Sequence, residues 1–249
     1  MKKENQWWLD FFEKDFRPFF NVLPTKGTGE EVRYVINKLK LKSGERVLDC
    51  PCGFGRISIP LAQKGLKVTG VDITPSYLDE LQKKAVRKGL KIITLPADMR
   101  KIEFRNQFDA ALNLGTSFGI FENDRDNLLA LRKMFHALKP GGRFVMHVKN
   151  RDWIIVNFAS RGWMQVGKAI SFEKRKFDYA KSINRIEWNF MKNGETHTRQ
   201  VALRMYSYHE LIEMFKKVGF VNVVGFSSIK DEPIDRNKQY MWVFGSKPK

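Results

Sequence analysis

The stretch that decides the fold is Val47-Leu-Asp-Cys-Pro-Cys-Gly-Phe-Gly-Arg56. It begins as a short apolar run, turns at two closely spaced glycines and continues into the helical spacing of Ile57, Ile59 and Leu61. Strand, glycine turn and helix in this order open a βαβ unit, and the glycines let the backbone approach a ligand closely. The stretch therefore predicts a parallel α/β domain with a ligand site at the turn.

Strand and helix patterns continue to alternate after this unit. Apolar runs predict strands at residues 66–72, 90–95, 108–114 and 143–148. Helical spacing predicts one helix from Thr74-Pro75 towards Gly89 and another over 124–138, which Lys139-Pro-Gly-Gly142 ends. We expect an α/β fold with a doubly wound, mostly parallel sheet, and a ligand site beyond the carboxyl ends of its strands.

The alternation changes after residue 150. Residues 185–190 and 198–205 alternate apolar and polar side chains on either side of Asn193-Gly194, which is a strong hairpin signal. In a two-residue turn there, Trp188 faces Arg199 and Phe190 faces His197. We expect an antiparallel β insert, followed by a helix with a Ser207–Glu210 capping box and by strands at 220–226 and 240–244.

An aromatic segment and a further helix precede the first strand. Thr28 and Glu31 have the spacing of a capping box for a helix that leads to Leu39. The earlier segment packs its apolar face on the domain, covers the ligand site as a lid, or does both. Its aromatic residues are Trp7, Trp8, Phe11, Phe12, Phe16, Phe19 and Phe20.

The elements predict four consecutive parts within one α/β domain. Residues 1–45 hold the N-terminal aromatic lid and first helix, and 46–150 form a Rossmann-like core with the ligand site at its glycine turn. Residues 151–205 form the β insert, whose aromatic face is a plain core layer, a cover over the ligand site or a dimer contact, and 206–249 complete the core sheet. The oligomeric state is expected to be monomer or homodimer.

Charge is the unusual feature of the composition. The 249 residues include 45 Lys and Arg against 27 Asp and Glu, a net charge of +18. Such an excess makes a polyanionic partner worth considering, but the basic residues are spread along the whole chain, as on a solvated surface. The apolar and charged fractions of 43% and 29% are typical of a folded globular chain and exclude a wholly disordered one.

Cysteine content and hydropathy bear on metal sites, disulfides and membrane spans. The sequence has two cysteines, Cys50 and Cys52, which are two positions apart. Neither a disulfide framework nor a zinc site is therefore predicted, and no bound metal is expected. An uncharged apolar run near the ~20 residues of a membrane span is absent from the sequence. We expect a cytoplasmic protein with no membrane partner.

The residues around the glycine turn indicate the ligand. Asp49 ends the first strand, where a carboxylate repels a pyrophosphate but suits a cation, and Ser58 stands where a dinucleotide fingerprint has its third glycine. Asp72 ends the second strand, where an acidic side chain accepts the ribose hydroxyls. An adenosine-like ligand with positive charge and no phosphates fits this pattern, and S-adenosylmethionine is such a ligand.

Five segments in order carry a family resemblance. Residues 47–56, Val71-Asp72, Ala97-Asp98-Met99, Phe108-Asp109 and Leu138-Lys-Pro-Gly-Gly142 resemble the class I S-adenosylmethionine-dependent methyltransferases, across roughly residues 30–148. The resemblance implies a seven-stranded sheet whose last strand is antiparallel. One departure is Pro51, which replaces the first glycine of the family motif and has no N–H to donate.

The resemblance also implies roles at the cofactor. Asp49 and the Gly53–Gly55 turn hold the methionine portion, Asp72 the ribose, and Asp98 with the Met99 backbone the adenine. Leu114 contacts the methionyl end, while Arg56 meets the cofactor carboxylate or faces solvent. The full set of expected cofactor residues is Asp49, Cys50, Gly53, Gly55, Arg56, Asp72, Ile73, Asp98, Met99, Asn113 and Leu114.

The second half of the chain is similar to small-molecule methyltransferases such as amino-sugar and glycine N-methyltransferases. In those enzymes an N-terminal segment and a β insert wall the acceptor site. His147, at the end of the fifth strand, is the first candidate for a base or substrate contact, with a purely structural role as the alternative. The other expected substrate residues are Thr116, Ser117, Phe118, Asn150 and Arg151.

Three functional hypotheses follow from these observations. The first is methyl transfer from S-adenosylmethionine to nitrogen or oxygen of a small-molecule acceptor, by in-line displacement. The second is a tRNA or rRNA methyltransferase, which the net charge suggests; residues 113–116 read Asn-Leu-Gly-Thr rather than the Asn/Asp-Pro-Pro-Tyr/Phe motif of amino-methylating nucleic-acid enzymes. The third is a binding module without catalysis.

Overall fold

The structure is a computed structural model that describes residues 6–12, 27–166, 169–192 and 195–249. Three of the expected lid aromatics, Phe16, Phe19 and Phe20, and the Asn193-Gly194 turn lie outside the described residues. The helices are α1 (Trp7–Asp10), α3 (Thr28–Lys38), α4 (Ser58–Gln63), α5 (Pro75–Arg87), α6 (Asp124–Ala137), α7 (Arg151–Val156) and α8 (Tyr208–Val218).

Seven strands form the main sheet, in the order β10-β11-β5-β4-β1-β2-β3. Strands β1, β2, β3, β4 and β5 pair in parallel, and β11 is antiparallel to both β5 and β10. The expected fold, including the antiparallel last strand, is therefore confirmed. The bounds are β1 (Arg46–Asp49), β2 (Lys67–Asp72), β3 (Ile93–Pro96), β4 (Phe108–Asn113), β5 (Leu138–Lys149), β10 (Val221–Phe226) and β11 (Tyr240–Ser246).

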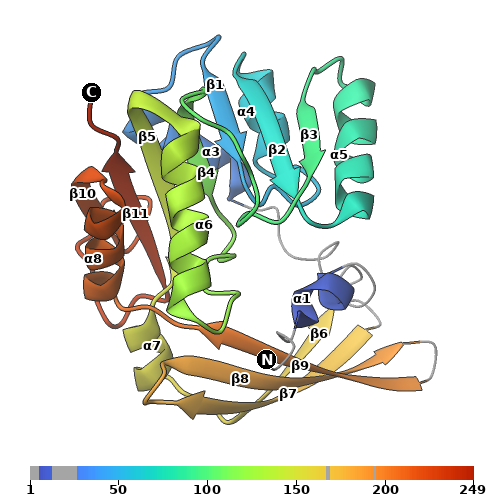
Figure 1. The fold of residues 1–249 in the computed structure, drawn as a ribbon. Coiled ribbons are helices and arrows are strands. Elements are labelled where there is room, and N and C mark those ends of the chain that lie inside the picture. Colours follow the sequence, from blue (N-terminus) through green and yellow to red (C-terminus); the bar gives the residue numbers. More distant parts are fainter. Residues whose placement is uncertain (1–5, 13–26, 167–168, 193–194) are drawn as a thin grey trace.

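Helices cover both faces of this sheet (Figure 1). On one face α3, α4 and α5 bury Val35, Leu61 and Leu81 against the sheet. On the other, α6 and α8 bury Leu131 and Phe215. The periodic apolar positions of the helices thus face the sheet, as the doubly wound arrangement requires.

A second, antiparallel sheet lies below the first in Figure 1, in the order β6-β7-β8-β9. In β8 and β9, Trp188 pairs with Arg199 and Phe190 with His197, which confirms the predicted hairpin register. The sheet has four strands where the sequence indicated two. Its bounds are β6 (Arg161–Val166), β7 (Ala169–Asp178), β8 (Ile183–Lys192) and β9 (Glu195–Arg204).

The two missed strands carry an inverted pattern. In β7, Ser171 is fully buried while its neighbour Phe172 is 58% exposed, and the paired Trp163 of β6 is 69% exposed. A strand is recognised in a sequence by apolar side chains on its buried face. With the polar residue inside and the aromatic residues outside, that signal was misleading here.

Helix α1 lies between the two sheets (Figure 1). Trp8 is buried against Phe121 of the core, with ring centroids 5.2 Å apart. Phe11 is buried against Trp188 of the insert, at 5.1 Å. These edge-to-face and tilted contacts join the core to the insert through the N-terminal segment.

The two predicted capping boxes have different outcomes. The box at Ser207 and Glu210 is present. The one at Thr28 and Glu31 is wrong, because α3 begins at Thr28 itself after Gly27, and no side chain caps it. Both side chains instead contact Arg56.

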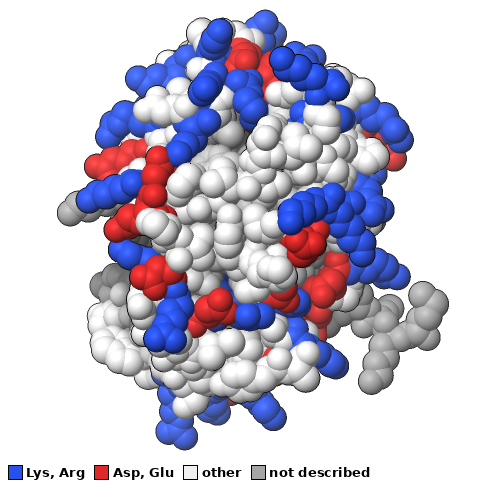
Figure 2. Space-filling model, turned by 90° about the vertical axis from the view of Figure 1, so that its left-hand side faces the viewer, with Lys and Arg blue, Asp and Glu red and all other residues white. Residues whose placement is uncertain are grey.

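On the face of the molecule that Figure 2 draws, basic residues are spread out rather than gathered in one place. Figure 2 shows Lys and Arg side chains spread over one face of the molecule, with Asp and Glu among them. Within the described part of the chain, each helix is too short or too polar to cross a bilayer.

Candidate active site

A cavity of about 630 Å³ opens at the carboxyl ends of the core strands. Its volume is within the range of about 300–1,000 Å³ that is usual for small-molecule sites. The ends of β1, β2, β4 and β5 and the first turn of α3 line it, together with Trp8 of α1 and Phe12 shortly after that helix. The cavity therefore lies where open α/β sheets bind ligands.

Asp49 lies at the end of β1, in the floor of this cavity, and is 1% exposed. The hydroxyl of Ser58 donates a hydrogen bond to its carboxylate, at 2.5 Å. Burial raises the pKa of Asp49 to about 7, although Ser58 and Arg56 counteract part of this effect. A negative charge here is poorly solvated, so a cation that enters the cavity is favoured.

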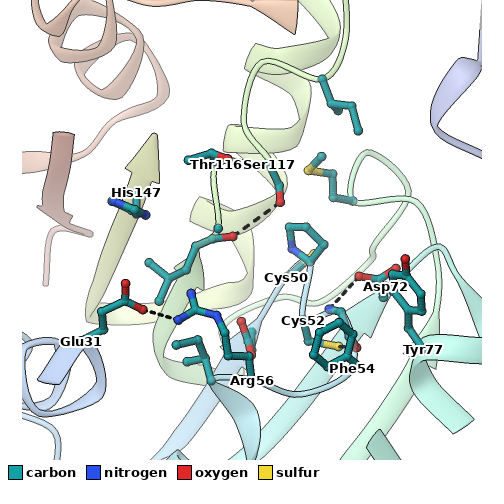
Figure 3. Close-up of a pocket in the computed structure, with 18 of the residues that line it drawn as sticks. Glu31, Cys50, Cys52, Phe54, Arg56, Asp72, Tyr77, Thr116, Ser117 and His147 are labelled. Carbon is teal, nitrogen blue, oxygen red and sulfur yellow. Dashed lines mark hydrogen bonds and ion pairs between the residues drawn. The ribbon is translucent and has the colours of Figure 1, made fainter. Parts of the chain in front are cut away.

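Asp72 lies at the end of β2 and is held by two backbone N–H groups. Gly53 donates to one carboxylate oxygen at 2.8 Å and Thr74 to the other at 2.9 Å. The first of these bonds ties the glycine turn to β2 (Figure 3). Burial raises the pKa of Asp72. Each carboxylate oxygen keeps a lone pair for a ligand hydroxyl.

Asp98 also lines the cavity, but its carboxylate is engaged. Arg100 donates to it through Nε and Nη2, at 3.0 and 2.7 Å, and its Nη1 donates to Asp126 at 2.9 Å. The guanidinium also lies over the ring of Phe121, at 4.1 Å. The role expected for Asp98 thus depends on the lone pairs that Arg100 leaves.

Arg56 lines the cavity and is bound to the first turn of α3. Its Nη1 donates to the Glu31 carboxylate, an ion pair drawn in Figure 3, and to the Thr28 hydroxyl at 3.2 Å. The side chains of Arg56 and Glu31 are 30% and 25% exposed. Arg56 is therefore neither free in solvent nor fully buried.

His147 stands between two aromatic side chains of β11. Its ring centroid is 4.3 Å from that of Trp242 and 5.0 Å from that of Tyr240. Burial lowers the pKa of His147 to about 3, and Nδ1 has no hydrogen-bond partner among the described residues. The imidazole is therefore neutral and a weak base, with one ring nitrogen available for a hydrogen bond.

Most of the residues expected at the site line the cavity. From the cofactor set these are Asp49, Cys50, Gly53, Arg56, Asp72, Ile73, Asp98, Met99 and Leu114, and from the substrate set Thr116 and Ser117, with His147. Thr116 donates its backbone N–H to the His147 carbonyl oxygen at 3.1 Å, which joins the ends of β4 and β5.

Five expected residues lie outside the cavity lining. Asn113 is buried, and its side-chain amide donates to the Cys50 carbonyl oxygen at 2.9 Å. It therefore holds the end of β4 to the turn that follows β1. Gly55 packs against Leu81 at a φ of +84°.

The other three are substrate candidates with structural contacts. The Phe118 ring packs on Tyr206 at 5.3 Å. Asn150 caps α7 through its side chain, and Arg151 donates to Glu210 at 2.9 Å.

Sequence reasoning missed several residues that line the cavity. Glu31 was assigned to a helix cap, and Tyr240 and Trp242 were placed in a strand without a role at the site. Strand pairing brings Trp242 opposite His147. Register between distant strands has no signal in either local sequence. The other lining residues without a predicted role include Gly27, Glu30, Phe54, Ile57, Tyr77, Ile120, Phe121, Ser227, Ser228 and Ile229.

The donor set fits S-adenosylmethionine. Asp49, Asp72 and Asp98 offer carboxylates to its cationic and hydroxyl groups. Gly53 has a φ of +53°, and a Cβ placed on it would meet no atom within 4 Å, so the turn presents bare backbone to open space. Burial raises the pKa of the Cys50 thiol, which keeps it neutral beside these acids.

Several known proteins with similar sequences are named as methyltransferases. A family described as "Methyltransferase domain" matches residues 47–142. YqeM of Bacillus subtilis (strain 168), named as a methyltransferase, is 32% identical over 182 residues, which are 70% of this chain and 73% of YqeM. A glycine/sarcosine N-methyltransferase of Parasynechococcus marenigrum (strain WH8102) is 27% identical over 78% of this chain and 69% of its own length.

A solved structure shows the same fold over nearly the whole chain. The CcbJ methyltransferase from Streptomyces caelestis superposes with a TM-score of 0.81, covering 96% of this chain and 98% of its own, at 19% identity. Family, fold and cavity agree with one another. The chain belongs to the class I methyltransferases, whose cofactor is S-adenosylmethionine.

Proposed function

We propose that this enzyme transfers a methyl group to a nitrogen atom of a small molecule that is enclosed in the cavity. The observation that carries the proposal is the continuity of the cavity, which joins the three acidic residues of the core to a wall of aromatic and hydroxyl side chains. Cofactor and acceptor can then occupy one water-excluding space. The glycine/sarcosine N-methyltransferase relative supports a small acceptor.

The acidic half of the cavity is proposed to hold the cofactor. Asp72 is positioned to accept hydrogen bonds from the ribose, because Gly53 and Thr74 fix its carboxylate. Met99 and Asp98 would hold the adenine, and Asp49 the positively charged methionyl portion. The bound cofactor supplies the methyl group as an electrophile on a sulfonium.

The opposite half is proposed to hold the acceptor. Thr116, Ser117 and His147 offer polar groups at the ends of β4 and β5. Trp8 of α1 and Phe12 after it close the space from the N-terminal segment. The contribution of these residues to an in-line displacement is to orient the acceptor and to exclude water.

The low pKa of His147 favours nitrogen over oxygen as the acceptor atom. An alcohol must lose its proton during methylation, whereas a neutral amine already has the lone pair that attacks. A pKa of about 3 makes His147 a poor proton acceptor at neutral pH. Its neutral ring can still orient an amine through a hydrogen bond.

Methyl incorporation from radiolabelled S-adenosylmethionine tests this function. Small amines, small hydroxyl compounds and bulk tRNA would be offered in parallel to the wild type, to Asp72→Asn and to a control, Asp79→Asn, at an exposed position of α5. We expect incorporation into one or more amines, loss of it in Asp72→Asn and no change in the control. Incorporation confined to tRNA or to hydroxyl compounds would refute the proposal.

A further inference from the structure

One acidic side chain in the cavity wall has no role in the proposed cofactor site. Glu30 lies in the first turn of α3, is exposed and lines the cavity. Its carboxylate makes no hydrogen bond or ion pair with the described residues, whereas the neighbouring Glu31 is paired with Arg56. An acidic residue in the first turn of a helix is favoured by the helix dipole. Because Glu30 also faces a ligand cavity, its charge is available to a ligand as well.

Tyr240 of β11 lies near this turn of the helix. Its ring is half-buried and lines the cavity, and its hydroxyl has no hydrogen-bond partner within the described ranges. Burial and the nearby Glu31 carboxylate raise the pKa of Tyr240. Its ring centroid is 5.0 Å from that of His147. Glu30, Tyr240 and His147 therefore line the same part of the cavity wall.

This part of the wall lies away from the residue proposed to hold the ribose. Figure 3 shows Glu31 and His147 on one side of the cavity and Asp72 on the other. Thr116 donates its backbone N–H to the His147 carbonyl oxygen and continues the wall towards the end of β4. The wall beside His147 thus belongs to the half of the cavity that is proposed to hold the acceptor.

The chemistry of this wall fits a cation. A carboxylate attracts an ammonium group, and a tyrosine ring adds a π face and a hydroxyl oxygen that accepts a hydrogen bond. An anion has no comparable partner, because Arg56, the one lysine or arginine among the described lining residues, is already bound to Glu31. The low pKa of His147 keeps its ring neutral, so it adds no positive charge.

We propose that Glu30 and Tyr240 bind a protonated ammonium group of the acceptor, other than the nitrogen that is methylated. The acceptors are then diamines without a carboxylate, and this inference rests on the proposed N-methylation. The reacting amine loses its proton to water, and its lone pair attacks the methyl carbon. The C–S bond breaks, sulfur keeps that electron pair, and the methylated nitrogen takes the positive charge. The ammonium at Glu30 is unchanged and orients the acceptor.

Matched acceptors separate the two ends of such a molecule. Diaminopropane, diaminobutane and diaminopentane would each be compared with two analogues, in which a methyl group or a carboxylate replaces the second ammonium. Radiolabelled methyl transfer gives kcat and KM for each compound in the wild type, Glu30→Gln, Glu30→Asp, Tyr240→Phe and the exposed control Asp79→Asn. Calorimetry with S-adenosylhomocysteine and a thermal melt would show whether each variant binds nucleoside and is folded.

The preference for the second ammonium should depend on Glu30. We expect kcat/KM of at least one diamine to exceed that of its methyl analogue by roughly 10- to 100-fold, as for a charge-assisted hydrogen bond, and that of its carboxylate analogue by more. Glu30→Gln should bring this preference to within about threefold of unity, through KM rather than kcat. Glu30→Asp should retain part of it, Tyr240→Phe should lower it by about threefold, and the control should keep it.

The outcomes distinguish this inference from the proposed function. If the methyl or carboxylate analogues are methylated as well as the diamines, or if folded Glu30→Gln keeps the preference, the ammonium site is refuted while N-methylation stands. A Glu30→Gln variant that loses activity equally with every amine would show a helix-dipole role alone and would also overturn the inference. If no amine accepts a methyl group, the proposed function itself fails.

Discussion

Replacement of Asp49 by Asn should stabilise the free enzyme and weaken its hold on the cofactor. The pKa of Asp49 rises from its ordinary value of 3.8 to about 7, mainly through burial. Each pKa unit corresponds to about 1.4 kcal/mol, so the ionised carboxylate destabilises the folded state by up to roughly 4 kcal/mol above pH 7. Asparagine is nearly the same size and still offers Ser58 an oxygen to bond.

The sign of this effect follows from proton binding. Between pH 4 and 7 the folded protein retains the Asp49 proton while the unfolded chain loses it, so the free energy of unfolding falls as the pH rises. The advantage of Asp49→Asn is therefore smallest, about 1 kcal/mol, at pH 4.5 and largest at pH 8. At roughly 2–4 °C per kcal/mol for a chain of this size, the melting temperature at pH 8 should rise by up to about 15 °C.

Thermal melts from pH 4.5 to 8, and calorimetry with S-adenosylmethionine, would measure both effects. Asp79→Asn on exposed α5 is the matched control and should change the free energy of unfolding by less than about 0.5 kcal/mol. Affinity for the cofactor should fall at least tenfold in Asp49→Asn, because the neutral amide does not attract its cationic groups. A stability difference that does not vary with pH, or a variant less stable than wild type at pH 8, would refute the reasoning.

Three further predictions concern pH, an ion-pair network and a tight backbone contact. Wild-type affinity for S-adenosylmethionine should rise by up to about tenfold per pH unit below 7 and level off above it, since the cation favours ionised Asp49; calorimetry should find this slope missing in Asp49→Asn. Arg100→Met removes the arginine that pairs with both Asp98 and Asp126, which are nearly buried, and should lower the free energy of unfolding by about 3–5 kcal/mol in urea titrations, with partial recovery near pH 4; equal losses at both pH values would contradict this. In Gly119→Ala the new Cβ would lie 2.1 Å from the Arg204 carbonyl oxygen, so its melting temperature should fall well below that of Gly115→Ala, where φ is also positive but no atom lies within 4 Å.

The acidic half of the cavity was predictable because the residues that line it are defined by local sequence. Asp49 and Asp72 each follow an apolar run directly, and parallel strands bring their carboxyl ends to one edge of the sheet. Local pattern and global fold agree here, so the positions of these residues follow from the strand order alone.

The remainder of the site depends on pairings between distant segments. Glu31 meets Arg56 across 25 residues, and Tyr240 and Trp242 reach His147 through the antiparallel register of β11 on β5. Neither contact has a local signature. The position of Asp98 was predicted from the sequence, but its ion pair with Arg100 was not.

Charge separates the interior of the site from the rest of the chain. The whole sequence carries +18, yet the described side chains that line the cavity include five carboxylates and one arginine. The basic excess therefore lies outside the cavity lining, where it raises the local concentration of anions around the molecule. The cavity itself favours cations, such as a sulfonium or an ammonium group. An anionic acceptor would thus gain from the surface charge on approach and be disfavoured inside, whereas an amine acceptor is neutral or favoured there.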